Sequence, residues 1–561
     1  MRLVRTVGLF LGLPVAAMAQ SAPPSLDLLL TPHVQNGAVR DVGVTLKLEK
    51  PNVAEGTALL RMPTLIVSIP ATRYDGDAVQ ARDDAGPLPL TQKDEAPTPT
   101  GTYRQWLPTR ATVGDVVVTA KAPPRVVDAT TRTGPLFDLR ADGGGVLGAG
   151  ITFLPLPNTK NPYRLRVHWD LAALGPDATG AWSLGEGDVQ TVGPAELLAF
   201  SFYAAGPLKT YRNGNFAMYW LTDPPIAPSD VAARIQKLYA YMSNFFDDAN
   251  APYRVFIRHN PHRGGGGTAL AKSFMFGWNE ATAPTLDSMQ DLLAHEMTHN
   301  WPKIAGEHGD TAWYSEGNAE FYSLVLSYRA GVLTPDQFLE RINKRAADYY
   351  SNPLRNVSNG EAAKRFWSDW SAQRIPYGRG FLYLALTDAK IRAKSNNKHS
   401  LDDIVLAIQA QQRAKKTPGI ADWIALVGKE IGADAQRDYD SMAAGRPVVP
   451  TGAFGPCFKL VATKIRPFEL GFDEAGLMGD KKIVRGLVAG SAAAQAGLQE
   501  GDEIVQASDT LELSRKPDDA MLVRVKRGDG EKLIAYVPRG AAAQSYGWVR
   551  NTKIADSACR L

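Results

Sequence analysis

Residues 295–320 read HEMTHNWPKIAGEHGDTAWYSEGNAE. The first five residues, HEMTH, indicate the local fold of this region. His295 and His299 are four positions apart, and Glu296 follows the first of them directly. On a helix such histidines lie on one face, so both imidazoles can reach a single metal ion. Glu296 then lies beside that ion, where it can take a proton from water. An apolar stripe of Leu286, Met289, Leu292, Leu293 and Met297 runs along this segment, and Thr285 precedes it as a possible helix cap. The pattern predicts a buried metal-binding helix.

A catalytic zinc ion needs a third protein ligand and one open position. The segment 313–320, WYSEGNAE, carries two glutamates one helical turn apart. We assign Glu316 to the metal and Glu320 to a supporting contact on His295, because a carboxylate on the second ring nitrogen fixes the tautomer. There are alternatives to this assignment: the two glutamates could exchange roles, or His308 could be the third ligand. Two further alternatives involve no metal: the glutamates could be solvated acids on a helix surface, and the two histidines could share a helix face by coincidence.

The bulk composition limits the classes of protein that need to be considered. At 561 residues the chain is too long for one core, so three or four folding units are expected. A hydrophobic content of 44% with 21% charged residues is ordinary for a globular protein. The formal net charge of +4 is small, which argues against nucleic acid or a membrane surface as the partner.

The N-terminus has the features of a secretory signal peptide. Arg2 and Arg5 precede an apolar run over 7–17, which ends in small residues. This pattern predicts a signal peptide over 1–19, cut before Gln20. A membrane anchor is the alternative, but the run is shorter than the ~20 residues that span a bilayer. The signal peptide predicts an exported protein, periplasmic or secreted. No later stretch is long and apolar enough to span a bilayer, so we expect the mature protein to be soluble outside the cytoplasm.

Cys457 and Cys559 are the two cysteines of the chain. In an oxidising compartment such a pair is a disulfide candidate, and two unpaired thiols are the alternative. A bond would tie the C-terminal tail to the start of the last globular segment.

The secondary-structure signals change twice along the chain. Alternating apolar residues, such as Val42, Val44, Leu46 and Leu48, dominate 20–205 and predict an antiparallel sandwich or a large curved sheet. Helical patterns dominate 206–450, with helix starts at residues such as Thr334 and Ser400 and one small sheet region. Short strands return over 452–546, and a tail follows over 547–561. The predicted fold class is multidomain: all-β, then α-rich, then a small β-rich module.

The motif HEMTHNW with Glu316 in WYSEGNAE resembles the gluzincin peptidases, whose thermolysin-like catalytic domain binds zinc through two histidines and one glutamate. Within that group the chain resembles the glycyl aminopeptidase family, in which a β domain, a thermolysin-like domain and a PDZ domain follow in this order. The resemblance covers nearly the whole mature chain. It implies an N-terminal β domain over 20–205, a thermolysin-like zinc peptidase domain over 206–450 and a PDZ domain over 452–546, with one zinc ion on His295, His299 and Glu316.

The resemblance also directs attention to RIPYGRG, residues 374–380. Related aminopeptidases carry Pro-Tyr-x-Lys-Gly, whose tyrosine donates a hydrogen bond to the tetrahedral oxyanion. Tyr377 matches this position, and a phenol aimed at developing negative charge would stabilise the transition state. Arg379 stands where the family has lysine, which keeps the charge and leaves its contact open.

One departure from the wider group concerns recognition of the substrate amine. Aminopeptidases of that group use a glutamate in a Gly-x-Met-Glu-Asn edge strand before the zinc helix, whereas the corresponding residues 266–274, GGTALAKSF, contain no carboxylate. The glycines suit close approach of an extended peptide, so substrate binding is expected at Gly266, Gly267, Thr268 and Ala269. Strict aminopeptidase specificity is therefore left open.

The C-terminal module contains two PDZ-like stretches. Residues 490–504 resemble the helix-to-strand turn of a PDZ domain. Leu470, Gly471 and Phe472 resemble the loop whose backbone amides capture a peptide C-terminus. The alternative is that this module only packs on the catalytic domain.

Together these features predict a zinc-dependent peptidase, an aminopeptidase acting on short peptides, in which Glu296 and Tyr377 are catalytic. Two alternatives come from other classes. One is a different zinc hydrolase, or an endopeptidase without amine recognition. The other is a non-catalytic protein that binds peptides through its PDZ domain.

Overall fold

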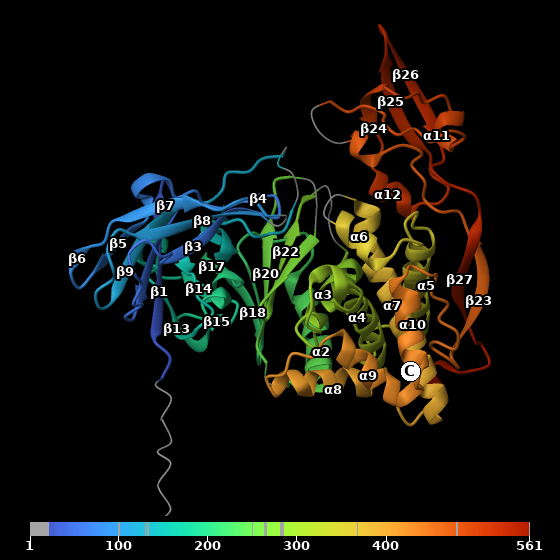
Figure 1. Ribbon diagram of the computed structural model, residues 1–561, viewed down its shortest axis with the longest axis horizontal. Helices are drawn as coiled ribbons and strands as arrows, with labels where there is room; N and C mark the ends of the chain where they lie inside the picture. The colour runs from blue at the N-terminus through green and yellow to red at the C-terminus, as the bar shows by residue number, and fades with distance from the viewer. Residues whose placement is uncertain are drawn as a thin grey trace, which may run out of the picture. The chain divides into compact units, whose positions relative to one another are not determined.

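A computed structural model describes residues 22–561, apart from 99–100, 130, 132–133, 250, 263–265, 281–284, 367–368, 478–480 and 560. The predicted signal peptide lies outside the described residues. The described chain forms two compact units: the first contains residues 22–127 and Gly134–Leu208, and the second contains the chain from Lys209 onward. In Figure 1 the first unit runs from blue to green and the second from green to red.

The first unit is built almost entirely of strands (Figure 1). Its elements are β1 (Ser25–Gln35), β2 (Ala38–Leu48), β3 (Leu60–Ile66), β4 (Ile69–Pro70), β5 (Gln80–Asp83), β6 (Gly86–Pro87), β7 (Leu90–Asp94), β8 (Gly101–Pro108), β9 (Val116–Ala122), β10 (Arg140–Asp142), β11 (Gly145–Ala149), β12 (Leu156–Pro157), β13 (Pro162–Trp169), β14 (Thr179–Trp182), β15 (Gly185–Glu186), β16 (Val189–Pro194), β17 (Phe202–Gly206) and the short helix α1 (Glu196–Ala199). They form three sheets, in the orders β16-β13-β1-β2-β9-β5-β6, β10-β11-β17-β14-β15 and β12-β3-β8-β7. The all-β prediction for the N-terminal region is confirmed.

Alternation of apolar residues sets the buried face of the largest sheet. Strand β1 pairs antiparallel with β2, so that Leu28 lies opposite Leu46 and Leu30 opposite Val44. All four side chains are buried, while the residues between them are more exposed. Because successive side chains of a strand point to opposite faces, this register brings the apolar set of both strands to one core.

The second unit opens with a mixed five-stranded sheet. Its strands are β18 (Lys209–Asn213), β19 (Phe216–Trp220), β20 (Tyr253–His259), β21 (Gly266–Leu270) and β22 (Ser273–Trp278). The order is β18-β19-β20-β22-β21, in which β19, β20 and β22 run parallel and the two outer strands run antiparallel to their neighbours. Strand β22 is buried along its whole length, and β21 forms the edge of the sheet beside it.

Nine helices of the described chain complete the main body of this unit. They are α2 (Pro228–Phe245), α3 (Leu286–Thr298), α4 (His308–Arg329), α5 (Pro335–Tyr350), α6 (Asn359–Arg365), α7 (Trp370–Ser395), α8 (Leu401–Arg413), α9 (Ile420–Ile431) and α10 (Asp434–Ala443). Thr285, Thr334 and Ser400 form reciprocal capping boxes at the starts of α3, α5 and α8. Each such cap contributes about 1 kcal/mol by satisfying backbone donors that the helix leaves free. Among the described helices, none combines the length and the apolar character that a membrane crossing requires.

The last part of the chain contains two small sheets, labelled in orange and red in Figure 1. The elements are β23 (Phe458–Ile465), α11 (Ala492–Gln495), β24 (Glu503–Ala507), α12 (Thr510–Arg515), β25 (Met521–Arg527), β26 (Gly530–Tyr536) and β27 (Ala543–Arg550). Strands β24, β25 and β26 form a sheet with its own core, which includes Val523, Val525 and Ile534. Strands β23 and β27 pair with each other, and Phe458 and Trp548 pack into the main core with the helices.

Cys457 and Cys559 are joined by a disulfide, as the sequence predicted. Both residues are buried within the main core of the second unit. The bond fixes the C-terminus of the chain beside the start of β23.

Candidate metal centre

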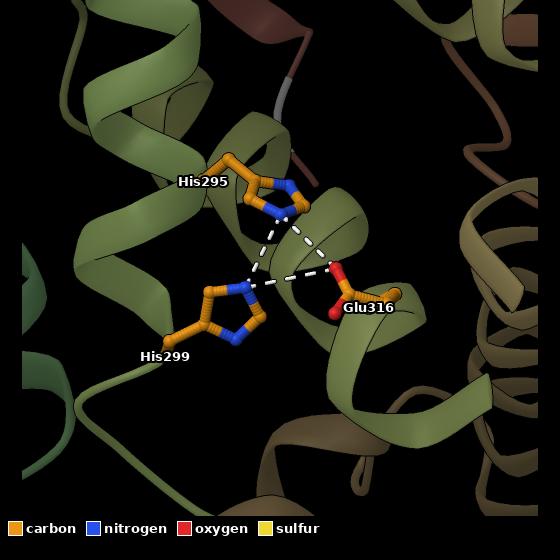
Figure 2. A group of neighbouring side chains, drawn as sticks. All are labelled: His295, His299 and Glu316. Carbon is orange, nitrogen blue, oxygen red and sulfur yellow. Dashed lines mark hydrogen bonds and ion pairs between the residues drawn. The ribbon is translucent and has the colours of Figure 1, made fainter. Parts of the chain in front are cut away.

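Three side chains from two helices converge on one point (Figure 2). His295 lies in the last turn of α3, and His299 caps the C-terminus of this helix. Their Nε2 atoms are 3.2 Å apart. Glu316 on α4 brings its Oε2 atom to 3.3 Å from Nε2 of His295 and to 3.7 Å from Nε2 of His299. Among the His, Cys, Asp and Glu side chains of the described residues, this is the one group with a spacing that suits a metal ion.

The donor set fits zinc. Ligand atoms about 2.0–2.1 Å from a tetrahedral ion lie about 3.3–3.4 Å from each other, which is close to the three observed separations. Oε2 of Glu316 is buried and has no hydrogen-bond donor among the described residues. A buried carboxylate oxygen without a partner is costly, and a cation between it and the imidazoles would satisfy it. Two histidines and one carboxylate leave a fourth position for water or substrate.

Glycines allow α4 to approach α7 closely enough to complete this centre. A Cβ on Gly317 would lie 2.5 Å from backbone atoms of Gly380, and a Cβ on Gly380 would lie 2.0 Å from the carbonyl oxygen of Trp313. No side chain fits in these spaces, so the two backbones touch. The contact brings Glu316 of α4 close enough to Tyr377 of α7 for the two groups to interact electrostatically.

The two histidines have opposite electrostatic surroundings. Burial acts to lower the pKa of His295, but the close carboxylates of Glu316 and Glu320 outweigh it and raise this pKa to about 10. Burial lowers the pKa of His299 to about 4, with little compensation. His299 is therefore neutral and ready to ligate, whereas metal binding must displace a proton from His295.

Glu296 lies at the centre without a partner of its own. Among the described residues it makes no hydrogen bond and no ion pair. Burial raises the pKa of Glu296 to about 7, and the nearby charges of Glu316 and Glu320 act in the same direction. A carboxyl group with a pKa near neutral is suited to exchange a proton with water and with a leaving amine.

Glu320 supports His295 from the other side of the ring. Its Oε1 lies 3.3 Å from Nδ1 of His295, and its Oε2 forms an ion pair with Arg345 of α5. Burial acts to raise the pKa of Glu320, but Arg345 and His295 reverse the effect and hold this pKa well below its usual range. Sequence reasoning did not find Arg345, because nothing in its local pattern connects α5 with the metal centre.

Tyr377 lies between His295 of the metal centre and the guanidinium group of Arg374. Its ring is nearly parallel to that of His295, with 5.8 Å between the centroids. The guanidinium carbon of Arg374 lies 4.3 Å from the centroid of the Tyr377 ring. Burial raises the pKa of the Tyr377 hydroxyl, so it keeps its proton and can donate a hydrogen bond.

Arg379 and His308 take no part in this group. Arg379 is fully buried and donates to the backbone carbonyls of Arg355 and Val357 and to the side chain of Asn359. It therefore anchors the loop before α6. His308 begins α4 and packs its ring against Phe366.

The expected substrate strand is the edge strand β21, which contacts α3 and pairs only with β22 among the described strands. Gly267 has a packing reason that the sequence did not reveal: a Cβ at this position would lie 1.7 Å from the ring of Phe274. Thr268 and Ala269 follow on the same strand, and its five residues include no carboxylate.

The expected carboxylate-binding loop lies in the small module. Leu470 and Phe472 are buried in the core of that module, and Gly471 between them has a φ of +86°, which favours glycine. The carbonyl of Gly471 accepts from the amide of Val488, and the carbonyl of Leu470 accepts from the hydroxyl of Tyr536.

The fold and the site together have the features of a zinc metallopeptidase of the gluzincin type. The model of a family described as M61 glycyl aminopeptidase matches residues 288–377, a span that contains the whole metal centre with Arg345 and Tyr377. This match confirms the resemblance that the motifs indicated.

Among solved structures, an aminopeptidase N family protein from Idiomarina loihiensis is 14% identical, with a TM-score of 0.64, and the alignment covers 93% of this chain and 98% of that chain. An M1 zinc metallopeptidase from Deinococcus radiodurans is 16% identical, with a TM-score of 0.47, over 77% of this chain and 96% of that chain. The likeness to the first protein shows a shared fold. No curated protein matches the chain.

Proposed function

We propose that this chain is a zinc-dependent aminopeptidase that cleaves short peptides by attack of water on the scissile carbonyl. One observation carries the proposal: the ligand atoms of His295, His299 and Glu316 lie 3.2–3.7 Å apart, and the adjacent Glu296 makes no hydrogen bond or ion pair with any described residue. The family match to residues 288–377 supports the same reaction class.

The chemistry divides between the ion and the chain. A zinc ion held by His295, His299 and Glu316 would polarise the scissile carbonyl and lower the pKa of a nearby water molecule. Glu296 accepts a proton from the attacking water and later passes it to the leaving amine. Tyr377 donates its phenol O–H to the oxyanion and stabilises the developing charge. Glu320, held by Arg345, fixes the ring of His295.

The variant Glu296→Gln tests the proposal most directly. Glutamine has the same shape and cannot accept the proton, so we expect normal zinc content and a loss of turnover of about 10²–10⁴-fold. Zinc is measured by atomic absorption and turnover by peptide cleavage, with and without chelator. Wild-type protein that contains zinc and cleaves no peptide would contradict the proposed function.

A second candidate is an endopeptidase, because β21 carries no carboxylate for the substrate amine. We propose the aminopeptidase as the first choice on the strength of the family match. A panel of peptides with free and acetylated N-termini separates the two. Equal cleavage of both sets would select the endopeptidase.

We also propose that the module around β24, β25 and β26 is a PDZ domain whose loop Leu470–Phe472 takes a peptide C-terminus. The backbone amides of Leu470, Gly471 and Phe472 make no hydrogen bond to the described residues, which supports a role in binding a carboxylate. Calorimetry with peptides that differ only in a free or amidated C-terminus tests this. Lack of binding by both would favour a module that only packs on the helices.

The site of action is proposed to lie outside the cytoplasm. The buried disulfide between Cys457 and Cys559 is consistent with an oxidising compartment. N-terminal sequencing of the protein recovered from the periplasm or medium should begin at Gln20, whereas protein retained in the cytoplasm would contradict export.

A further inference from the structure

Arg374 is a cation next to the metal centre, and none of the described residues forms a hydrogen bond or an ion pair with its side chain. It lies near the start of α7 and is partly buried. Its guanidinium carbon lies 4.3 Å from the ring centroid of Tyr377 and 5.6 Å from that of Trp370. Five N–H donors in a planar fork are therefore held in place by ring contacts and remain free for a ligand.

The neighbouring arginines are different. Arg345 pairs with Glu320, and Arg341, one turn earlier on α5, pairs with Asp291 of α3 at 2.8 Å. Arg379 donates three hydrogen bonds, two of them to backbone carbonyls. Each of these guanidinium groups has a structural partner, so the free donors of Arg374 are an exception around this centre.

Arg374 also borders a cavity of about 70 Å³. Trp370 and Ser371 line it from α7, and Phe468, Thr510 and Glu474 line it from the C-terminal module. The amide of Phe468 donates to the carbonyl of Ser351, which joins the module to the end of α5. Glu474 accepts a hydrogen bond of 2.8 Å from Thr510 and forms no pair with Arg374. The guanidinium thus borders a hollow that can admit the end of a ligand.

The distance to the metal centre suits a short peptide. The Tyr377 centroid is 5.8 Å from the His295 centroid and 4.3 Å from the guanidinium carbon, so Arg374 lies within about 10 Å of the His295 ring. An extended peptide advances about 3.3 Å per residue. When its scissile carbonyl lies at the metal centre, a carboxylate one to three residues further on comes within reach of Arg374.

We propose that Arg374 binds the C-terminal carboxylate of the substrate, so that the enzyme selects di-, tri- and tetrapeptides with a free carboxyl end. This inference rests on the proposed peptidase function. A guanidinium fork matches a carboxylate through two parallel hydrogen bonds. Strand β21 provides no carboxylate for the amine end, and Arg374 gives the site a charged contact for the opposite end of the peptide.

The test compares alanine peptides of two to six residues, each with a free C-terminal carboxylate and as its C-terminal amide. We expect the wild type to cleave the short acids about 10–100-fold more efficiently, in kcat/KM, than the matching amides. This preference should vanish in the longest peptides. Arg374→Ala should lower kcat/KM for the short acids to the level of the amides and leave the amides unchanged. Arg374→Lys should restore part of the preference.

Arg392→Ala is the matched control, because Arg392 lies on the same helix and already pairs with Asp388 at 2.7 Å. It should behave as the wild type. Equal cleavage of acids and amides by the wild type would overturn the inference while the peptidase function stands. An equal loss on both substrates in Arg374→Ala would overturn it as well and assign Arg374 to packing of Tyr377. If that variant fails to fold, the acid-to-amide ratio of the wild type decides alone. Zinc-loaded wild type that cleaves neither series would remove the proposed function itself.

Discussion

At the scale of single residues, His295 is the centre of a chain of charges. One ring nitrogen faces Glu316 at 3.3 Å, and the other faces Glu320 at the same distance. Arg345 completes the chain by pairing with Glu320. Because a carboxylate behind a ligating imidazole sets its tautomer and its basicity, we expect Arg345 to influence zinc binding through Glu320 and His295.

The variant Arg345→Met tests this chain. Methionine keeps the volume and removes the charge, so Glu320 loses the partner that fixes its orientation. We expect zinc affinity to fall about 10-fold, measured by competition with a chelating dye. Arg341→Met is the control, since Arg341 pairs with Asp291, which lies outside the metal centre. An unchanged zinc affinity in Arg345→Met would show that Glu320 is held by His295 alone.

At the scale of elements, the contact between α4 and α7 carries the site. Gly317 and Gly380 remove the side chains that would otherwise keep the two helices apart. Glu316 directly precedes Gly317, and Tyr377 lies within one turn of Gly380. The positions of the proposed metal ligand and of the proposed oxyanion donor therefore depend on this crossing.

We expect Gly380→Ala to lower the free energy of unfolding by about 1–3 kcal/mol, because its Cβ would overlap the Trp313 carbonyl. Zinc binding should weaken together with stability. Gly360→Ala is the matched control: in α6 the nearest neighbour of the new Cβ is 4.0 Å away, and alanine favours a helix by about 0.5–1 kcal/mol. Urea unfolding monitored by circular dichroism measures both. Equal stability of the two variants would contradict close packing at the crossing.

A buried carboxylate in the first unit predicts a pH dependence of stability. Asp83, at the end of β5, accepts from Arg110 at 2.6 and 2.8 Å and from the amides of Val113 and Ala85. Arg110 and these amides hold the pKa of Asp83 well below its usual range, although burial opposes them. The folded pKa is thus below the unfolded value of about 3.9, so this stabilisation is complete above that pH and is lost as the pH falls.

We expect Asp83→Asn to flatten the decline of unfolding free energy between about pH 4 and pH 2. Thermal unfolding at a series of pH values measures the slope. The exposed Asp188, which contacts His168 at 2.9 Å, provides the control variant Asp188→Asn with an unchanged slope. An identical slope in all three proteins would show that Asp83 titrates normally in the folded state.

At the scale of the whole molecule, the C-terminal end of the chain belongs to the same core as the helices. Cys559 bonds to Cys457 across 102 residues, and the carbonyl of Cys559 accepts from the hydroxyl of Tyr328 on α4. The segment that contains the small module is therefore a closed loop, attached at both ends to the body that holds the metal centre.

Opening this loop should destabilise the protein by about 2–5 kcal/mol, because the unfolded chain gains conformational freedom. The double variant Cys457→Ala, Cys559→Ala and the reduced wild type should unfold at the same, lower urea concentration. Zinc content at low denaturant should remain unchanged, since neither cysteine contacts the centre. A disulfide-free protein as stable as the oxidised one would contradict this prediction.

The sequence by itself predicted the features that depend on neighbouring residues, namely strands, helix starts and the spacing of the two histidines. Alternating residues around Val44 and Leu46 predicted an N-terminal unit of strands, and the caps at Thr285, Thr334 and Ser400 predicted helix starts, because each signal acts over a few neighbouring residues. The spacing of His295 and His299 required a shared helix face, and the pairing of Cys457 with Cys559 followed from their being the two cysteines. The predicted domain boundaries and the roles of the site residues stay predictions for the experiments above.

Tertiary structure alone decided what joins these pieces. Arg345 pairs with Glu320 because α5 packs beside α4, and Arg374 meets Tyr377 at the border of a cavity shared with the C-terminal module. Gly267 is small because Phe274 fills the space above it. Such contacts join residues through packing of distant segments, and no periodicity or motif along the chain records which charge will face which partner.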